Sequence, residues 1–225
     1  VTLNELKKAD IIVLTIPVDA IIAFNKQLDD LPQTTTVIDF GSTKQMIVEA
    51  LPQALKSHYI PAHPMTGTEK FGPSAACDAL YENKTIVLCD LEYVQILHKQ
   101  RVLKIFETIG MNIVYMNSSN HDVHACFMSH LPHAISFSLA TTVMSHEDPN
   151  SIIALAAGGF NDMSRVAKSS PNMWSDVFRQ NKDNLIKSID LFQNQMDYAK
   201  KLIENEEFDK LNDWMKKANT LHDIL

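Results

Sequence analysis

Glycine is scarce in this chain of 225 residues, which has six glycines where the usual frequency of about 7% would give roughly sixteen. So few glycines exclude a fibrous glycine repeat, and a hydrophobic content of 45% excludes a disordered chain. No apolar run reaches the ~20 residues of a membrane-spanning helix, and no basic and then apolar segment opens the chain. We therefore expect a globular protein with no membrane partner.

Positive charge and cysteine are also in short supply. The chain has 20 Lys and Arg against 27 Asp and Glu, with a formal net charge of -7. Because no block of Lys or Arg is present, the sequence offers no electrostatic basis for binding nucleic acid. Cys77, Cys89 and Cys126 are scattered and form no CxxC pair. These features favour a reduced, cytoplasmic protein.

In the first half of the chain, short β-branched or apolar runs alternate with helical patterns. Runs that are apolar throughout are typical of strands buried on both faces, and strands that alternate with helices indicate a mostly parallel sheet. We expect a doubly wound, Rossmann-like α/β domain. Its strands are predicted over residues 9–17, 35–40, 59–62, 84–89 and 111–115, and its helices over 18–28, 45–55 and 92–109.

No strand pattern recurs after Asn117, so the second half is predicted to be an all-helical domain. A long apolar helix is expected over residues 121–144, interrupted at Pro132, because proline inside a helix usually kinks it. The polar run 117–120 is the best boundary, which divides the chain into domains 1–117 and 118–225. Further helices are predicted over 149–157, 160–167, from Pro171 onward, 178–199 and 206–221, with Asp148 as a cap.

Two polar clusters follow predicted strands. Residues 39–44 (DFGSTK) end one strand, and residues 63–73 (HPMTGTEKFGP) end the next. Ligands of α/β proteins bind at the carboxyl ends of such strands. His63 is a candidate base, because histidine can accept a proton near neutral pH. The alternatives are an ordinary capped turn and an inert loop histidine.

Two further clusters lie in the helical half. Four histidines, at 121, 124, 130 and 133, raise the possibility of a metal site, but their spacing matches no familiar zinc pattern and a polar pocket is the better interpretation. Asp162 and Arg165 lie one helical turn apart, so the aspartate could orient the guanidinium to bind a carboxylate. A surface ion pair is the simpler alternative.

Taken in order, these segments closely resemble the prephenate dehydrogenase family, which includes arogenate dehydrogenases. The resemblance rests on ADIIVLTIPV, VIDFGSTK, AHPMTGTEKFGP, the HD pair with SHLPHA, and GGFNDMSRVAKSSPNMW. It implies a Rossmann domain and a helical domain that forms a homodimer. It also implies the oxidative decarboxylation of prephenate to 4-hydroxyphenylpyruvate with NAD or NADP, a step of tyrosine biosynthesis.

The resemblance also assigns site residues, and none of them binds a metal. His63 and Ser42 match the catalytic pair that contacts the ring hydroxyl of the substrate. The residues matched to substrate binding or to the order of its pocket are His133, Arg165, Thr68, Glu69, Asp122, Asp162 and Trp174. Those matched to cofactor contacts are Thr15, Ile16, Pro17 and Thr43.

One family feature is missing, since the six glycines cannot form the GxGxxG loop that binds the dinucleotide pyrophosphate. We expect roughly 60 to 70 residues before Val1, and we expect the chain alone to bind NAD poorly and to be inactive. The choice between NAD and NADP stays open. The alternatives are an arogenate dehydrogenase and a non-catalytic dimerising or substrate-sensing module.

Overall fold

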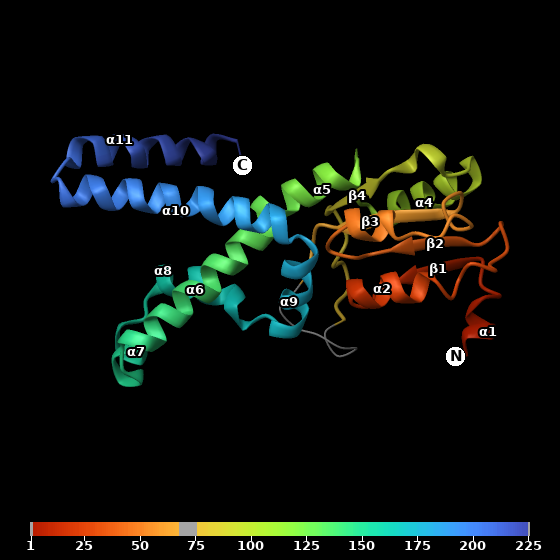
Figure 1. Ribbon diagram of the computed structural model, residues 1–225, viewed down its shortest axis with the longest axis horizontal. Coiled ribbons are helices and arrows are strands. Elements are labelled where there is room, and N and C mark those ends of the chain that lie inside the picture. Colours follow the sequence, from red (N-terminus) through yellow and green to blue (C-terminus); the bar gives the residue numbers. More distant parts are fainter. Residues whose placement is uncertain (1, 68–75, 225) are drawn as a thin grey trace. The chain divides into compact units, whose positions relative to one another are not determined.

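A five-stranded sheet forms the first half of the chain (Figure 1). The computed structural model describes residues 2–67 and 76–224. The strands lie in the order β1-β2-β3-β4-β5, and only the β3–β4 pair is antiparallel. The mostly parallel sheet predicted from the sequence is confirmed. Its strands are β1 Ile11–Leu14, β2 Thr36–Asp39, β3 Tyr59–Pro64, β4 Thr85–Cys89 and β5 Asn112–Met116.

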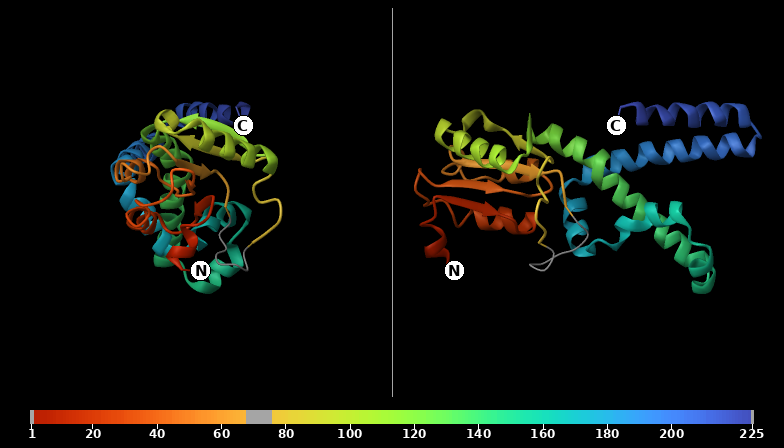
Figure 2. Two further views of the ribbon diagram at one scale, coloured as in Figure 1. Left: turned by 90° about the vertical axis from the view of Figure 1, so that its right-hand side faces the viewer. Right: turned by 180° about the vertical axis from the view of Figure 1, so that it is seen from behind.

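Helices cover both faces of this sheet, as a doubly wound fold requires. Val37 on β2 packs in a core with residues of α2 (Val18–Asn25) and α3 (Gln45–Glu49). The next residue, Ile38, packs in a second core with α4 (Ile96–Ile109). Because successive side chains of a strand point to opposite faces, the two cores lie on opposite sides of the sheet. Figures 1 and 2 show α2 and α4 on these two sides.

All three helices predicted in this half are shorter in the structure, and α2 ends at Asn25 instead of residue 28. Helix α3 ends at Glu49, well before the expected end at residue 55, because Pro52 disfavours helical backbone in the residue before it. The helix expected over 92–109 is divided into a 3-10 turn, η2 (Leu91–Tyr93), and α4. Gly110 ends α4 with φ +82°, a left-handed conformation that favours glycine. A short helix, α1 (Leu3–Leu6), precedes β1.

The long helix expected over 121–144 has a π-helical segment in its middle. Helix α5 (Ser118–Ala125) continues into the π-helix η3 (Cys126–His130) and then into α6 (Leu131–His146). Pro132 lies in the first turn of α6, directly after the π-helix. A π-helix adds a residue to the turn and so changes the direction in which later side chains point.

Shorter helices follow α6. Asp148 caps α7 (Pro149–Leu155) as predicted, since its carboxylate accepts hydrogen bonds from the N–H groups of Asn150 and Ser151. The next elements are α8 (Gly158–Ser164), the 3-10 turn η4 (Arg165–Lys168) and α9 (Pro171–Gln180).

The chain divides into two compact units, residues 1–182 and 183–225. The second unit holds most of α10 (Lys182–Glu204), together with α11 (Phe208–Asn219) and the 3-10 turn η5 (Thr220–Asp223). Within it, the indole N–H of Trp214 donates to Oε1 of Gln195 at 3.0 Å. Among the described residues, no helix is long and apolar enough to cross a membrane.

Candidate active site

A cleft of about 500 Å³ lies at the carboxyl ends of β1, β2 and β3. It brings together five residues that the sequence places in the site: Thr15, Ile16, Pro17, Ser42 and His63. These residues come from three separate strand ends, as expected for parallel strands of one sheet. The rest of the lining includes Tyr81, the cap residue Ser170 of α9, and Met173 and Asp176 of that helix.

The turn after β2 places Ser42 in the cleft. The N–H of Gly41 donates to Oδ1 of Asp39 at 2.9 Å, which closes a tight turn. A Cβ atom at position 41 would lie 2.7 Å from Cδ1 of Ile47. Glycine therefore fits at this position without a shift of the end of the Ile47 side chain.

His63, at the end of β3, is held by a second histidine. Its Nδ1 lies 2.8 Å from Nε2 of His121, and Nδ1 of His121 lies 2.8 Å from Oδ1 of Asp122. Burial lowers the pKa of His63 well below its usual range, and the proximity of His121 and of the Lys44 ammonium disfavours its charged form further. His63 is therefore a neutral base at physiological pH.

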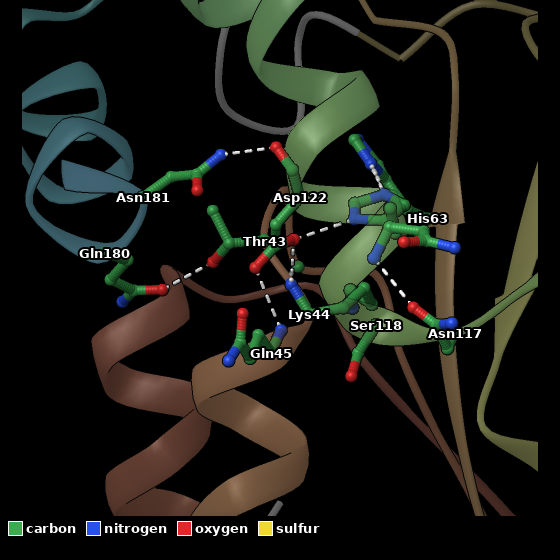
Figure 3. A network of polar contacts seen from close by, with 12 residues as sticks. Thr43, Lys44, Gln45, His63, Asn117, Ser118, Asp122, Gln180 and Asn181 are labelled. Carbon is green, nitrogen blue, oxygen red and sulfur yellow. Dashed lines mark hydrogen bonds and ion pairs between the residues drawn. The ribbon is translucent and has the colours of Figure 1, made fainter. Parts of the chain in front are cut away.

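The carboxylate of Asp122 links this series of hydrogen-bonded side chains to the sheet domain (Figure 3). Its Oδ1 accepts the N–H of Lys44 at 2.8 Å, and its Oδ2 accepts the N–H of Gln45 at 2.9 Å. These N–H groups open helix α3, where they have no partner inside the helix. The aspartate of α5 thus fixes both His121 and the loop that carries Ser42.

Lys44 is completely buried, and the interpretation of the sequence assigned it no role. Its ammonium group forms an ion pair with Asp39 and donates to the carbonyl of Ala62 at 2.9 Å. Ala62 directly precedes His63, so the lysine fixes the end of β3. In the sequence, only the position of Lys44 in the GSTK run pointed to a role near the site. A lysine near a strand end is usually exposed, so its burial was not expected.

The end of α9 contacts the same loop through residues that were not predicted. The hydroxyl of Thr43, expected to contact the cofactor, is buried and donates to Oε1 of Gln180 at 2.6 Å. The amide of Asn181 donates to the carbonyl of Asp122 at 2.7 Å and lies 3.1 Å from Nδ1 of His130. Figure 3 shows Gln180 directed at Thr43 of this loop and Asn181 directed at Asp122 of α5.

A second group of predicted residues gathers around Trp174. The ring of His133 stacks on the indole with centroids 3.6 Å apart, and His130 meets it edge-on at 6.0 Å. Burial lowers the pKa of His133, its hydrogen bond to the carbonyl of Ser129 opposes this effect, and the charge of Arg165 lowers the pKa further. These residues lie outside the lining of the 500 Å³ cleft.

Two predicted residues have fewer contacts than the sequence suggests. Asp162 and Arg165 are both exposed, and in the described part of the chain no ion pair joins them. The backbone changes from α8 to the 3-10 turn at Arg165, which alters the i,i+3 geometry. Thr68 and Glu69 lie outside the described residues. Within residues 2–67 and 76–224, no group of three or more His, Cys, Asp or Glu is placed to hold a metal ion.

Two family models match the chain. Residues 1–115 match the nucleotide-binding domain of prephenate dehydrogenase, and residues 117–217 match its dimerization domain. The chain belongs to the prephenate dehydrogenase family. It has the Rossmann-like sheet and the helical C-terminal region that this family combines, so the predicted family and fold class are confirmed.

Individual relatives agree with the family assignment. Prephenate dehydrogenase of Bacillus subtilis is 28% identical over 99% of this chain, which spans 62% of that relative's length. The crystal structure of the A. aeolicus prephenate dehydrogenase with hydroxyphenyl propionate and NAD+ is 31% identical, with a TM-score of 0.90 over 98% of this chain and 79% of that one. Synechocystis arogenate dehydrogenase is 28% identical, with a TM-score of 0.83 over 99% and 81%.

Proposed function

We propose that this chain carries the substrate site and the catalytic base of a prephenate dehydrogenase. The reaction is the oxidative decarboxylation of prephenate to 4-hydroxyphenylpyruvate, with transfer of a hydride to NAD or NADP, in tyrosine biosynthesis. The observation that carries the proposal is the neutral ring of His63, which shares one cleft with Ser42 and the exposed end of β1. Family membership supports the choice of reaction.

In this proposal His63 and Ser42 act on the ring hydroxyl of the substrate. His63 accepts the hydroxyl proton, because its pKa is held low and its ring is neutral before the reaction. Ser42 is half-buried in the same cleft and forms a second hydrogen bond to the hydroxyl. Removal of the proton pushes electron density into the ring, which favours departure of the hydride from the same carbon.

We assign the carboxylates of the substrate to the group around Trp174. Arg165 is the residue suited to grip a carboxylate, and His133 and Trp174 provide a flat, rigid surface beside it. Asp162, Thr68 and Glu69 are proposed to order this part of the pocket, and Asp122 orders the part around His63.

The described residues fit one end of the cofactor. Thr15, Ile16 and Pro17 follow β1 and line the cleft beside His63, where an α/β sheet holds its ligand. When bound, the nicotinamide supplies the acceptor for the hydride. Residues 1–225 contain no GxGxxG loop for the pyrophosphate, so we propose that this chain by itself holds NAD or NADP weakly.

We propose the division at 117/118 as the domain boundary, and a homodimer formed through the second domain. Helix α5 begins at Ser118 with Asn117 as its cap, and the dimerization model starts at 117. We also propose a cytoplasmic location, because two of the three thiols are buried and none belongs to a CxxC pair.

Arogenate is the second candidate substrate, favoured by the similarity to the Synechocystis arogenate dehydrogenase. Prephenate carries a keto group on its side chain where arogenate carries an amine. Turnover of each substrate with NAD and with NADP, measured on the protein with any residues that its gene encodes before Val1, tests both proposals. Faster NADH or NADPH formation from prephenate supports the first candidate, and faster formation from arogenate supports the second. No turnover of either substrate would favour the alternative of a non-catalytic dimerising or substrate-sensing module.

A further inference from the structure

Two hydrogen bonds link Asp122, His121 and His63 in series, and the carboxylate of Asp122 determines which atom donates in each bond. A carboxylate can only accept, so Nδ1 of His121, at 2.8 Å from Oδ1 of Asp122, is the donor in that bond. A neutral His121 then carries its lone pair on Nε2. Nδ1 of His63, at 2.8 Å from this Nε2, must be the donor in the second bond.

We propose that Asp122 and His121 are positioning residues that fix His63 in the tautomer with its proton on Nδ1. This arrangement leaves the lone pair of His63 on Nε2, where it can receive a proton from a substrate hydroxyl. The inference rests on the proposed function for its catalytic meaning, although the tautomer is a property of the chain alone. The role is more specific than packing, because it determines which ring atom is basic.

Burial and fixed geometry support this assignment. The side chains of His121 and Asp122 are 2% and 3% exposed, so water does not compete for their bonds. Asp122 also accepts the N–H groups of Lys44 and Gln45 and therefore cannot rotate away. Besides His121, the charged or titratable groups near His63 are Lys44 and His130, and both disfavour a positive charge on His63.

The same hydrogen bonds also stabilise the ring of His63 after it has accepted a proton. The O–H bond of the substrate breaks, its electron pair stays on oxygen, and the proton forms a new N–H bond at Nε2 of His63. The bond from Nδ1 of His63 to His121 is then donated by a charged ring, and such bonds are about twice as strong as neutral ones. The carboxylate of Asp122 stabilises the positive charge through His121.

The direct test is nuclear magnetic resonance of the 225-residue chain with ¹⁵N-labelled histidine, without substrate or cofactor. Long-range ¹H–¹⁵N correlations identify which nitrogen of each neutral ring carries the proton. We expect His63 as the Nδ1–H tautomer and His121 also as Nδ1–H. A His63 ring with its proton on Nε2, next to a doubly protonated His121, would overturn the proposal.

Three variants separate positioning from simple packing. His121→Phe keeps a ring but removes the acceptor, so His63 should lose its single tautomer. His121→Gln restores an acceptor near the position of Nε2 and should recover the Nδ1–H form. His124→Gln, on the exposed side of α5, should leave the spectrum of His63 unchanged. The same tautomer of His63 in the Phe variant as in the unmodified chain would contradict the proposal.

Kinetics on the active protein provides an independent measurement. If the proposed function is right, His121→Phe lowers kcat by at least about tenfold with little change in KM, because a base held in the wrong tautomer cannot accept the proton. It also moves the acid limb of the pH profile. Unchanged kcat in the Phe variant would refute the positioning role. If no turnover is found in the unmodified protein, the proposed function fails, and the NMR result still decides the tautomer.

Discussion

The hydroxyl of Thr43 donates a hydrogen bond of 2.6 Å to Oε1 of Gln180, a residue 137 positions later in the chain. The bond joins the loop after β2, which carries Ser42, to the last turn of α9. The amide of Gln180 in turn donates to Asp19 at the start of α2. The loop that carries Ser42 is therefore fixed by a helix from the second half of the chain.

Loss of this bond should destabilise the fold. Thr43→Val keeps the shape of the side chain but leaves Oε1 of Gln180 buried without its donor, which costs about 1 to 3 kcal/mol of unfolding free energy. The measurement is the midpoint of urea unfolding. Thr43→Ser keeps the hydroxyl and should lose less than half as much. An equal loss in both variants would show that the methyl group, and not the bond, is the source of the stability.

The buried ion pair of Lys44 and Asp39 should respond differently to single and double changes. Lys44→Met leaves the carboxylate of Asp39 buried without its ion partner, and such changes cost about 3 to 5 kcal/mol. Replacing both residues, with Asp39→Asn added, removes the buried charge and should recover part of that loss. Urea unfolding of the single and double variants measures this, and a double variant no more stable than Lys44→Met would contradict the account.

Acid should weaken the fold through His130. Burial lowers its pKa to about 4 from the usual 6.5, against the opposite effect of the Asp122 carboxylate. The unfolded chain takes up a proton below 6.5, and the folded chain does not until about 4. Above pH 6.5 this histidine does not destabilise the fold. As the pH falls from 6.5 to 4, it lowers the unfolding free energy by roughly 3 kcal/mol.

A variant pair isolates this contribution. His130→Asn keeps an acceptor for the amide of Asn181 but cannot titrate, so its stability should fall less steeply between pH 6.5 and 4. His124→Asn, at an exposed position, should follow the unmodified chain. Parallel pH dependences for His130→Asn and the unmodified chain would show that another group controls acid unfolding.

Product binding distinguishes a catalytic chain from a structural remnant. Isothermal titration of the 225-residue chain with 4-hydroxyphenylpyruvate should show binding, because His63, Ser42, His133 and Arg165 are all present. Titration with NAD should show much weaker binding, because these residues include no glycine-rich phosphate loop. Absence of binding to both ligands would favour the non-catalytic module, and tight binding of NAD would contradict our assignment of the cofactor site.

The strands and their alternation with helices could be predicted from the sequence because each strand is a short apolar run with clear ends. The antiparallel pairing of β3 with β4 could not, since periodicity does not record strand direction. The π-helix at Cys126–His130 was also missed, because its composition is that of an ordinary helix. Pro132 was the visible anomaly, and it marks the start of α6 directly after the π-helix.

The site residues likewise divide into those marked by a local sequence motif and those brought together by tertiary contacts. Residues at strand ends, such as Ser42 and His63, could be located because their local motifs are specific. His121 was noticed as part of a histidine cluster, but its contact with His63 joins elements 58 positions apart in the sequence. Asn181 gave no signal, and Lys44 gave none beyond its place in the GSTK run, because burial of a polar side chain depends on tertiary packing that no local pattern records.

One pair of variants decides whether His63 is the base in the proposed prephenate dehydrogenase reaction. His63→Asn and His124→Asn make the same chemical change, the first in the cleft and the second at an exposed position of α5. With prephenate as substrate, we predict that His63→Asn lowers kcat about 10²- to 10⁴-fold, the usual contribution of a general base, while His124→Asn has normal turnover. Comparable turnover in the two variants would contradict the account.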